Sequence, residues 1–120
     1  MIEATITGNV GKAPEFQISK SGKPMTRFSV ASTSKHGDQE RTTWVDVTCF
    51  DEQAEVVSES VQKGDRVIVT GRLELEQYTK KDGTPGSSLR MIASDVGKSL
   101  RWHHRDSQRQ EEREEVAVPF

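Results

Sequence analysis

Apolar and polar residues alternate with a period of two along several short stretches of the chain, which predicts β-strands. Residues 2–7 alternate in this way, and three residues that disfavour regular strands then break the pattern: Gly8, Gly11 and Pro14. The alternation resumes over residues 26–33, where Phe28 and Val30 are expected to point inward. The stretch at 87–97 has the composition of a last, returning strand.

Three stretches between these strands predict turns or hairpin loops. SKSGKP at 19–24 and KKDGTPG at 80–86 combine glycine, which permits unusual dihedral angles, with proline, which cannot donate a ladder hydrogen bond. The charged stretch SKHGDQER at 34–41 predicts a hairpin loop. These positions divide the chain into antiparallel pairs of neighbouring strands.

The stretch TTWVDVTCF at 42–50 has an unusual polar side. Its apolar side is that of an ordinary core strand and contains Val45, Val47 and Cys49. The opposite side combines two large aromatic residues with an acid and a hydroxyl: Trp44, Asp46, Thr48 and Phe50. The pattern therefore predicts a half-buried strand that holds aromatic rings on its solvent side.

Residues 51–62 follow a helical rather than a strand period. Asp51 is expected to cap the helix, because a carboxylate there accepts hydrogen bonds from free backbone N–H groups. Its narrow apolar stripe is expected to close one end of a larger assembly of strands and consists of Ala54, Val57 and Val61. Gly64 is a stop signal for the helix.

The stretch at 65–73 contains an unbroken apolar run from Val67 to Val69, which predicts a strand buried on both faces. Beyond it, Leu73 and Leu75 are expected to continue one face. The other face is polar except for one aromatic residue and consists of Arg72, Glu74, Glu76, Tyr78 and Lys80.

Three strands, a short helix and two further strands make up the predicted order of elements. Closing five short strands into a barrel removes their exposed edges, and the OB-fold is the five-stranded barrel of this size. We therefore expect an all-β OB-fold barrel over residues 1–105, with its helix between strands three and four. Residues 106–120 lack a core-forming period over their first ten positions and predict a disordered acidic tail that ends in Pro-Phe.

Composition limits the classes of function. Residues 1–105 carry 15 Lys or Arg and 14 Asp or Glu, whereas residues 106–120 carry 2 and 5, so bulk charge does not predict nucleic-acid binding and the placement of charges must decide. No apolar stretch approaches the ~18 residues of a membrane span, and no signal peptide is evident, so a cytoplasmic location is expected. Neither a metal nor a cofactor is expected, because the adjacent His103 and His104 do not have ligand spacing. No enzyme is expected either, since the lone thiol of Cys49 would face the core.

The aromatic residues on polar faces favour stacking on nucleic-acid bases. Every base has a π-face, so aromatic rings beside cations bind single strands without reading their sequence. The expected rings are Trp44, Phe50 and Tyr78. The cations expected to contact phosphates are Lys35, Arg41, Arg72, Lys80, Lys81 and Arg90. Packing under a loop or in a subunit contact is the alternative for each ring taken alone.

Four stretches resemble bacterial single-stranded DNA-binding proteins: TITGNVGKAPEF, SGKPMTRFSVAST, TTWVDVTCFDEQAEVVSESVQKGDRVIVTGRLE and QYTKKDGTPG. They cover about residues 4–97, and VGKSLRW at 96–102 resembles the actinobacterial branch. The resemblance implies an OB-fold, usually a homotetramer, that wraps single-stranded DNA in replication, repair and recombination and that associates with the nucleoid. It also places His36 near a stacking position. Glu52, Glu74 and Glu76 replace basic residues of some relatives, which lowers the expected affinity.

The resemblance also implies that the tail recruits replication and repair proteins through residues Glu114, Glu115, Pro119 and Phe120. The linker before it is nearly absent, and glutamate replaces the usual aspartate, which is compatible with a phage, mobile-element or second chromosomal copy. Two other functions remain open: an OB-fold adaptor that binds proteins through the same aromatic face, and an RNA-binding barrel.

Overall fold

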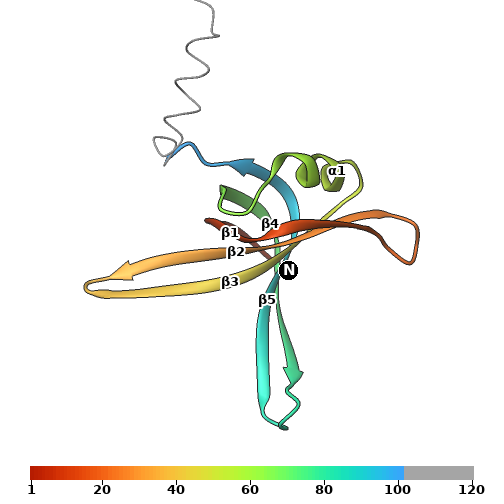
Figure 1. The fold of residues 1–120 in the computed structure, drawn as a ribbon. Helices are drawn as coiled ribbons and strands as arrows, with labels where there is room; N and C mark the ends of the chain where they lie inside the picture. Colours follow the sequence, from red (N-terminus) through yellow and green to blue (C-terminus); the bar gives the residue numbers. More distant parts are fainter. Residues whose placement is uncertain (102–120) are drawn as a thin grey trace, which may run out of the picture.

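The computed structural model of the protein describes residues 1–101, which form a closed five-stranded barrel with one helix (Figure 1). The strands lie in the order β1-β2-β3-β5-β4 around the barrel. The elements are β1 (Ile2–Ile18), β2 (Pro24–His36), β3 (Gln39–Phe50), α1 (Asp51–Ser60), β4 (Arg66–Thr79) and β5 (Pro85–Lys98). This order, with its helix between β3 and β4, confirms the predicted OB-fold. The predicted tail, residues 106–120, lies outside the described residues.

A short parallel contact closes the barrel. β3 and β5 pair only from Val45 opposite Leu89 to Thr48 opposite Ile92. Beyond this contact, β3 continues outward paired with β2, and β5 continues outward paired with β4. The two hairpins therefore project from the barrel as separate two-stranded ribbons (Figure 1).

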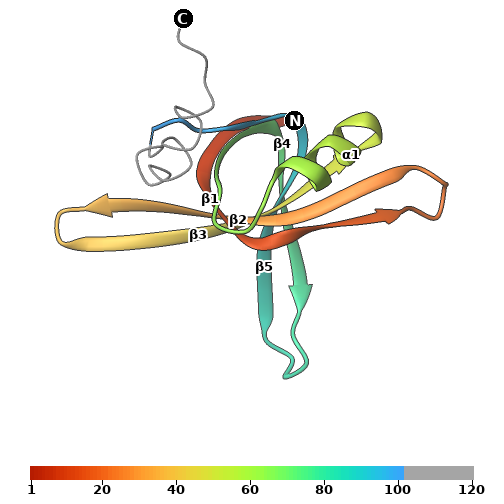
Figure 2. The ribbon, with the colours of Figure 1, turned by 45° about the horizontal axis from the view of Figure 1, so that its top comes forward.

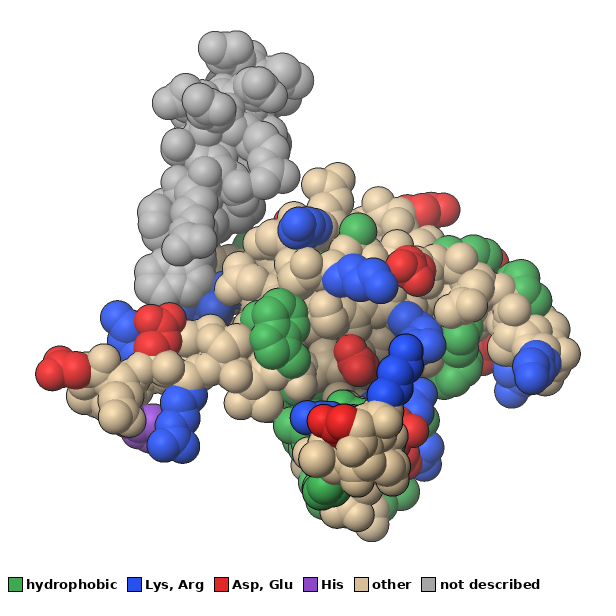
Figure 3. All heavy atoms as spheres, turned by 60° about the horizontal axis from the view of Figure 1, so that its bottom comes forward, with side chains coloured by type: hydrophobic (Ala, Val, Ile, Leu, Met, Phe, Trp, Pro, Cys, Tyr) green, Lys and Arg blue, Asp and Glu red, His purple; other side chains and the backbone are tan. Residues whose placement is uncertain are grey.

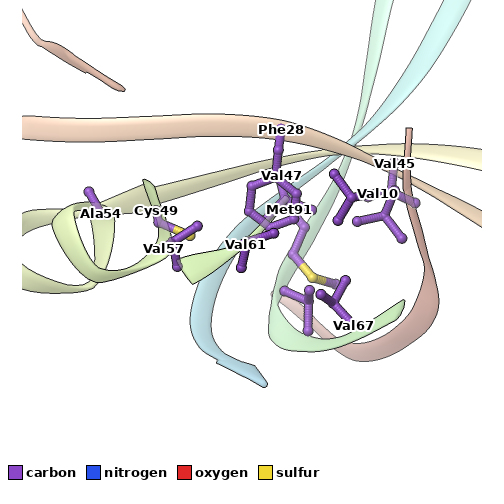
Figure 4. Close-up of a cluster of buried hydrophobic side chains, with 12 residues drawn as sticks. Val10, Phe28, Val45, Val47, Cys49, Ala54, Val57, Val61, Val67 and Met91 are labelled. Carbon is purple, nitrogen blue, oxygen red and sulfur yellow. The ribbon is translucent and has the colours of Figure 1, made fainter. Parts of the chain in front are cut away.

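The core is a continuous cluster of small apolar side chains inside the barrel (Figure 4). Phe28, Val30, Val45 and Val47 point inward, which confirms the period of two predicted for β2 and β3. Met91 of β5 is fully buried and packs in the same cluster. Among residues 1–101, the core contains one aromatic ring, that of Phe28, and otherwise mostly valines.

Helix α1 lies against β1, β2 and β3 and covers one end of the barrel, as predicted (Figure 2). Ala54, Val57 and the following Val61 are buried. The hydroxyl of the buried Thr26 donates a 2.7 Å hydrogen bond to the carbonyl of Ala54, which ties the helix to β2. The predicted cap is wrong: Asp51 is the first helical residue, at φ 59°, and no side chain caps the N-terminus.

Two strands differ from their predicted form. β1 does not end at Gly8 but continues to Ile18. Shifts in its pairing with β2 between Val10 and Glu15 accommodate the residues that disfavour a regular ladder. Gly8 lies directly against the backbone of Ala31, where a Cβ atom has no room. β4 is not buried on both faces: Val67 and Val69 are fully buried, whereas the intervening Ile68 is 41% exposed.

The predicted loop at 34–41 is also wrong, since most of it is strand. β2 and β3 stay paired until His36 lies opposite Gln39, so the connection is a tight turn at Gly37 and Asp38. Gly37 supplies the positive φ, at 64°, that such a turn needs. Lys35 and Arg41 therefore sit on paired strands, with their positions set by the ladder.

Candidate nucleic-acid interface

One side of the barrel carries the three predicted aromatic rings and two of the six predicted cations, and we call it the outer face. Residues that lie opposite each other in a sheet point to the same side. On β3 this face contains Trp44, Asp46 and Phe50, and on β2 it contains Arg27 opposite Thr48 and Ser29 opposite Asp46. It continues onto β5 and β4 because Asp46 lies opposite Arg90, which lies opposite Glu74. Its described members are Lys12, Arg27, Ser29, Trp44, Asp46, Phe50, Arg72, Glu74, Glu76, Tyr78 and Arg90.

Trp44 is 55% exposed, although it is one of the largest side chains in the protein. Its six-membered ring reaches across β2 and packs against Gly11 of β1, where any Cβ atom would collide with it. Gly11 therefore serves as a seat for the indole. A ring supported on one side and open on the other can accept a base on its free side.

Tyr78 repeats this arrangement on the β4–β5 ribbon. The ring is 49% exposed and packs against Gly86, which lies opposite it on β5. A Cβ atom at Gly86 would lie 2.7 Å from the ring atoms. A hollow of about 570 Å³ adjoins the ring and is lined by Gln77, Tyr78, Lys80, Pro85, Gly86 and Ser87.

Phe50 occupies a different place. It ends β3, lies opposite Met25 and directly precedes helix α1. It is less exposed than Trp44 and Tyr78. Trp44 and Phe50 are six positions apart on one strand, a distance of about 20 Å at ~3.3 Å per residue.

The predicted cations occupy three places. Arg72 and Arg90 lie on the outer face, and each contacts a carboxylate there: Arg72 with Glu74 at 3.3 Å and Arg90 with Glu76 at 2.9 Å. Lys80 and Lys81 lie in the turn that joins β4 to β5, and Lys80 lines the hollow beside Tyr78.

Lys35, His36 and Arg41 lie near the end of the β2–β3 ribbon. Lys35 shares the side of Trp44 by register, whereas His36 and Arg41 share the opposite side. The structure therefore brings Lys35 onto the tryptophan's side of the ribbon, and it places the other two on the reverse side.

Two cations on the outer face were missed by sequence reasoning. Lys12 lies opposite Ser29, and Arg27 lies between the positions of Trp44 and Phe50. A hollow of about 170 Å³ lies beside them and is lined by Lys12, Glu15, Arg27, Phe28, Ser29 and Asp46. The alternation of residues 26–33 already put Arg27 on a polar side, but only the strand register shows which aromatic residues share that side.

Cys49 lies in the core, where desolvation raises the pKa of its thiol to about 11. The thiol is therefore protonated and poorly nucleophilic at neutral pH. Within residues 1–101, no group of three His, Cys, Asp or Glu side chains is arranged to hold a metal ion. No helix in the same part of the chain is long and apolar enough to cross a membrane.

Comparison with known proteins places the chain in a family. The model of the single-strand binding protein family matches residues 1–99. The chain belongs to this family. Its match confirms the resemblance carried by the four sequence stretches, and it covers every strand of the barrel and both exposed aromatic residues seated on glycines.

The similar curated proteins are mostly actinobacterial. The single-stranded DNA-binding protein of Paenarthrobacter aurescens is 34% identical over 82% of this chain and 61% of its own length. Its counterpart in Corynebacterium glutamicum is 36% identical over 88% and 50%. Single-stranded DNA-binding protein 2 of Streptomyces coelicolor is 36% identical over 81% and 52%. The chain thus spans about half to three fifths of the length of these relatives.

A solved structure supports the same fold. The crystal structure of the small single-stranded DNA-binding protein from Streptomyces coelicolor superposes with a TM-score of 0.74 at 29% identity. The match covers 82% of this chain and 94% of that chain.

Proposed function

We propose that this protein binds single-stranded DNA without reading its sequence and protects it during replication, recombination and repair. The observation that carries the proposal is the pair of exposed rings, Trp44 and Tyr78, each seated on a glycine of the neighbouring strand. A ring that merely filled space under a loop would be covered on both sides. Membership of the single-strand binding protein family supports the same function.

Base stacking and phosphate contacts both contribute to the free energy of DNA binding in this mechanism. Each base stacked on Trp44, Phe50 or Tyr78 contributes roughly 1–3 kcal/mol, and one OB-fold covers about 4–16 nucleotides. Lys and Arg side chains neutralise the phosphates between the stacked bases, which releases counterions and makes binding salt-dependent. Trp44 and Phe50 lie on β3 and Tyr78 lies on β4, with β5 between these strands, so a DNA strand that contacts all three rings must cross β3, β5 and β4.

Tryptophan fluorescence tests the proposal directly. The chain has two tryptophans, Trp44 and Trp102, so a Trp102→Phe variant reports on Trp44 alone. We expect oligo-dT to quench this emission and high salt to reverse the quenching. Equal binding of oligo-U would favour the RNA-binding barrel instead, and an unchanged emission with no change in the anisotropy of labelled oligo-dT would favour the protein adaptor.

Assembly and partner recruitment extend the proposal. We infer a homotetramer, supported by apolar side chains left exposed on the barrel, among them Ile2 and Ile68. We also infer that Glu114, Glu115, Pro119 and Phe120 recruit replication and repair proteins, supported by the acidic, apolar-ended sequence of residues 111–120. Both functions fit a cytoplasmic protein that associates with the nucleoid.

A further inference from the structure

The two arginines on the β4–β5 side of the outer face are already occupied by carboxylates. Arg90 Nη1 donates a 2.9 Å hydrogen bond to Glu76 Oε2 across the ladder. Arg72 Nε lies 3.3 Å from Glu74 Oε1 on the same strand. By strand register, both contacts lie in the region between Trp44 and Tyr78 that a bound strand must cross. Figure 3 shows basic and acidic side chains close together on one face of the molecule.

Arg90 has two further acidic neighbours besides Glu76. Glu74 lies directly opposite it on β4, and Asp46 lies directly opposite it on β3. Three carboxylates and two arginines therefore share this part of the outer face, for a local net charge of −1. The region contains cations but does not present a positive surface to a phosphate.

The β1–β2 side of the same face differs. Glu15 lies directly opposite Arg27 on β1, and Asp46 lines the same hollow, but Arg27 forms no ion pair with any residue in 1–101, and Glu15 contacts Lys12 at 3.3 Å instead. Arg27 lies between the positions of Trp44 and Phe50. The outer face thus has one arginine open to phosphate near two aromatic rings, and two arginines that are occupied.

We propose that Glu74 and Glu76 limit affinity by standing in for DNA phosphates on Arg72 and Arg90. A bound DNA strand first contacts the side of the outer face that carries Trp44 and Arg27. It contacts the arginines on the β4–β5 side only after it has displaced the two carboxylates from them. This inference rests on the proposed DNA-binding function. It assigns Glu74 and Glu76 as residues that set the strength and the salt dependence of binding.

A phosphate can replace the carboxylate on Arg90 at little energetic cost. The side chains of Arg90 and Glu76 are 44% and 49% exposed, and exposed pairs of this kind contribute little stability. The displaced carboxylate nevertheless remains close to the strand and repels it. A phosphate on Arg90 therefore gains less, and releases fewer counterions, than a phosphate on an unpaired arginine.

The salt dependence of oligo-dT binding by the full-length chain tests this inference. Each phosphate neutralised on a single strand contributes about 0.7 to the slope of log K against log salt. We expect Glu76→Gln to bind several-fold more tightly at low salt and to steepen the slope by up to about 0.7. The matched control is Glu59→Gln, which removes the same charge from an exposed position on helix α1. Equal changes in both variants would reduce the effect to net charge and overturn the inference.

A double-mutant comparison shows whether Glu76 competes with phosphate for Arg90 or positions Arg90 for DNA binding. If Glu76 competes with phosphate, Arg90→Gln costs little affinity in the natural background and cancels the gain in the Glu76→Gln background. If Glu76 instead positions Arg90 for DNA, Glu76→Gln weakens binding and the inference is wrong. A natural chain that binds oligo-dT together with a Glu76→Gln variant of unchanged affinity and slope would refute this inference alone. A natural chain that does not bind oligo-dT would refute the proposed function, and the inference with it.

Discussion

At the scale of single residues, two glycines decide how the exposed aromatic rings are held. Gly11 and Gly86 leave open the space that a side chain would fill, and the rings of Trp44 and Tyr78 lie in that space. Each ring thus packs against the backbone of a glycine on a neighbouring strand. This arrangement keeps one ring face free for a ligand at little conformational cost.

Removing the indole should weaken DNA binding directly. Trp44→Ala is expected to reduce affinity for oligo-dT by roughly 1–3 kcal/mol, the contribution of one stacked base. Fluorescence anisotropy of a labelled oligo-dT measures this loss, and Trp44→Phe, which keeps a smaller ring, should retain part of the affinity. Unchanged affinity in a folded Trp44→Ala variant would remove this residue from the site.

Displacing the indole without removing it gives a second test at the residue scale. Gly11→Ala introduces a Cβ atom where the Trp44 ring now lies, so the ring must move. We expect weaker oligo-dT binding and less quenching, although the tryptophan is still present. Gly97→Ala is the matched control, because a Cβ atom there meets no atom within 4 Å. Equal binding by the two variants would show that the glycine seat has no role in binding.

At the scale of strands and helix, the period of two correctly predicted much of the barrel. Its predictions were wrong where the burial or continuity of a strand depends on the geometry of the barrel. The inward side chains of β2 and β3, such as Phe28 and Val47, follow from alternation alone. The apolar run around Ile68 misleads, because the outer side of a barrel strand faces solvent whatever residue occupies it. Pro14 misleads in the opposite sense, because an irregular ladder accommodates it.

In the candidate site, too, some features could be predicted from local sequence and others depend on the fold. The exposed aromatic residues were predictable, since each stands on the polar side of an alternating strand. Their relation to Arg27 and the pairing of Arg90 with Glu76 depend on register between strands that are distant in sequence. No local pattern encodes that register, so the two missed cations and the occupied arginines appear only in the folded chain.

The helix is attached to the barrel by a contact that can be tested separately from binding. Thr26→Val removes the hydroxyl that donates to the carbonyl of Ala54, whereas that carbonyl keeps the hydrogen bond it accepts within helix α1. We expect the free energy of unfolding to fall by about 0.5–1.5 kcal/mol, measured by denaturant titration. Binding of oligo-dT by the folded variant should be unchanged, because the contact faces the core side of β2. A loss of binding without a loss of stability would contradict this assignment.

At the scale of the whole molecule, exposed apolar side chains and charge distribution lead to different predictions. We expect light scattering at micromolar concentration to give the mass of four chains, because association covers apolar positions such as Ile2 and Ile68. Replacing Ile68 by Lys should weaken the assembly, because a charge there is costly to bury in an apolar contact. A monomer mass for the natural chain would contradict the proposed homotetramer.

The charge of the whole chain lies mostly in its last residues, and this predicts a competition that salt controls. The body of the protein is nearly neutral, whereas residues 111–120 include four acids: Glu111, Glu112, Glu114 and Glu115. These acids repel phosphate, so a chain ending at Gln110 should bind oligo-dT more tightly than the full chain. The difference should be largest at low ionic strength and should shrink as salt rises, since the screening length falls from about 30 Å at 0.01 M to about 8 Å at 0.15 M.

The same truncation distinguishes repulsion from recruitment. If residues 111–120 bind partner proteins, the shortened chain should lose replication and repair proteins from a pull-down while it gains affinity for DNA. A matched variant with Gln in place of the four acids, but with Pro119 and Phe120 kept, separates the two contributions. It should reproduce the gain in DNA affinity, and any partner binding that remains must depend on the apolar end. Identical partners for the full and shortened chains would show that this segment acts through its charge alone.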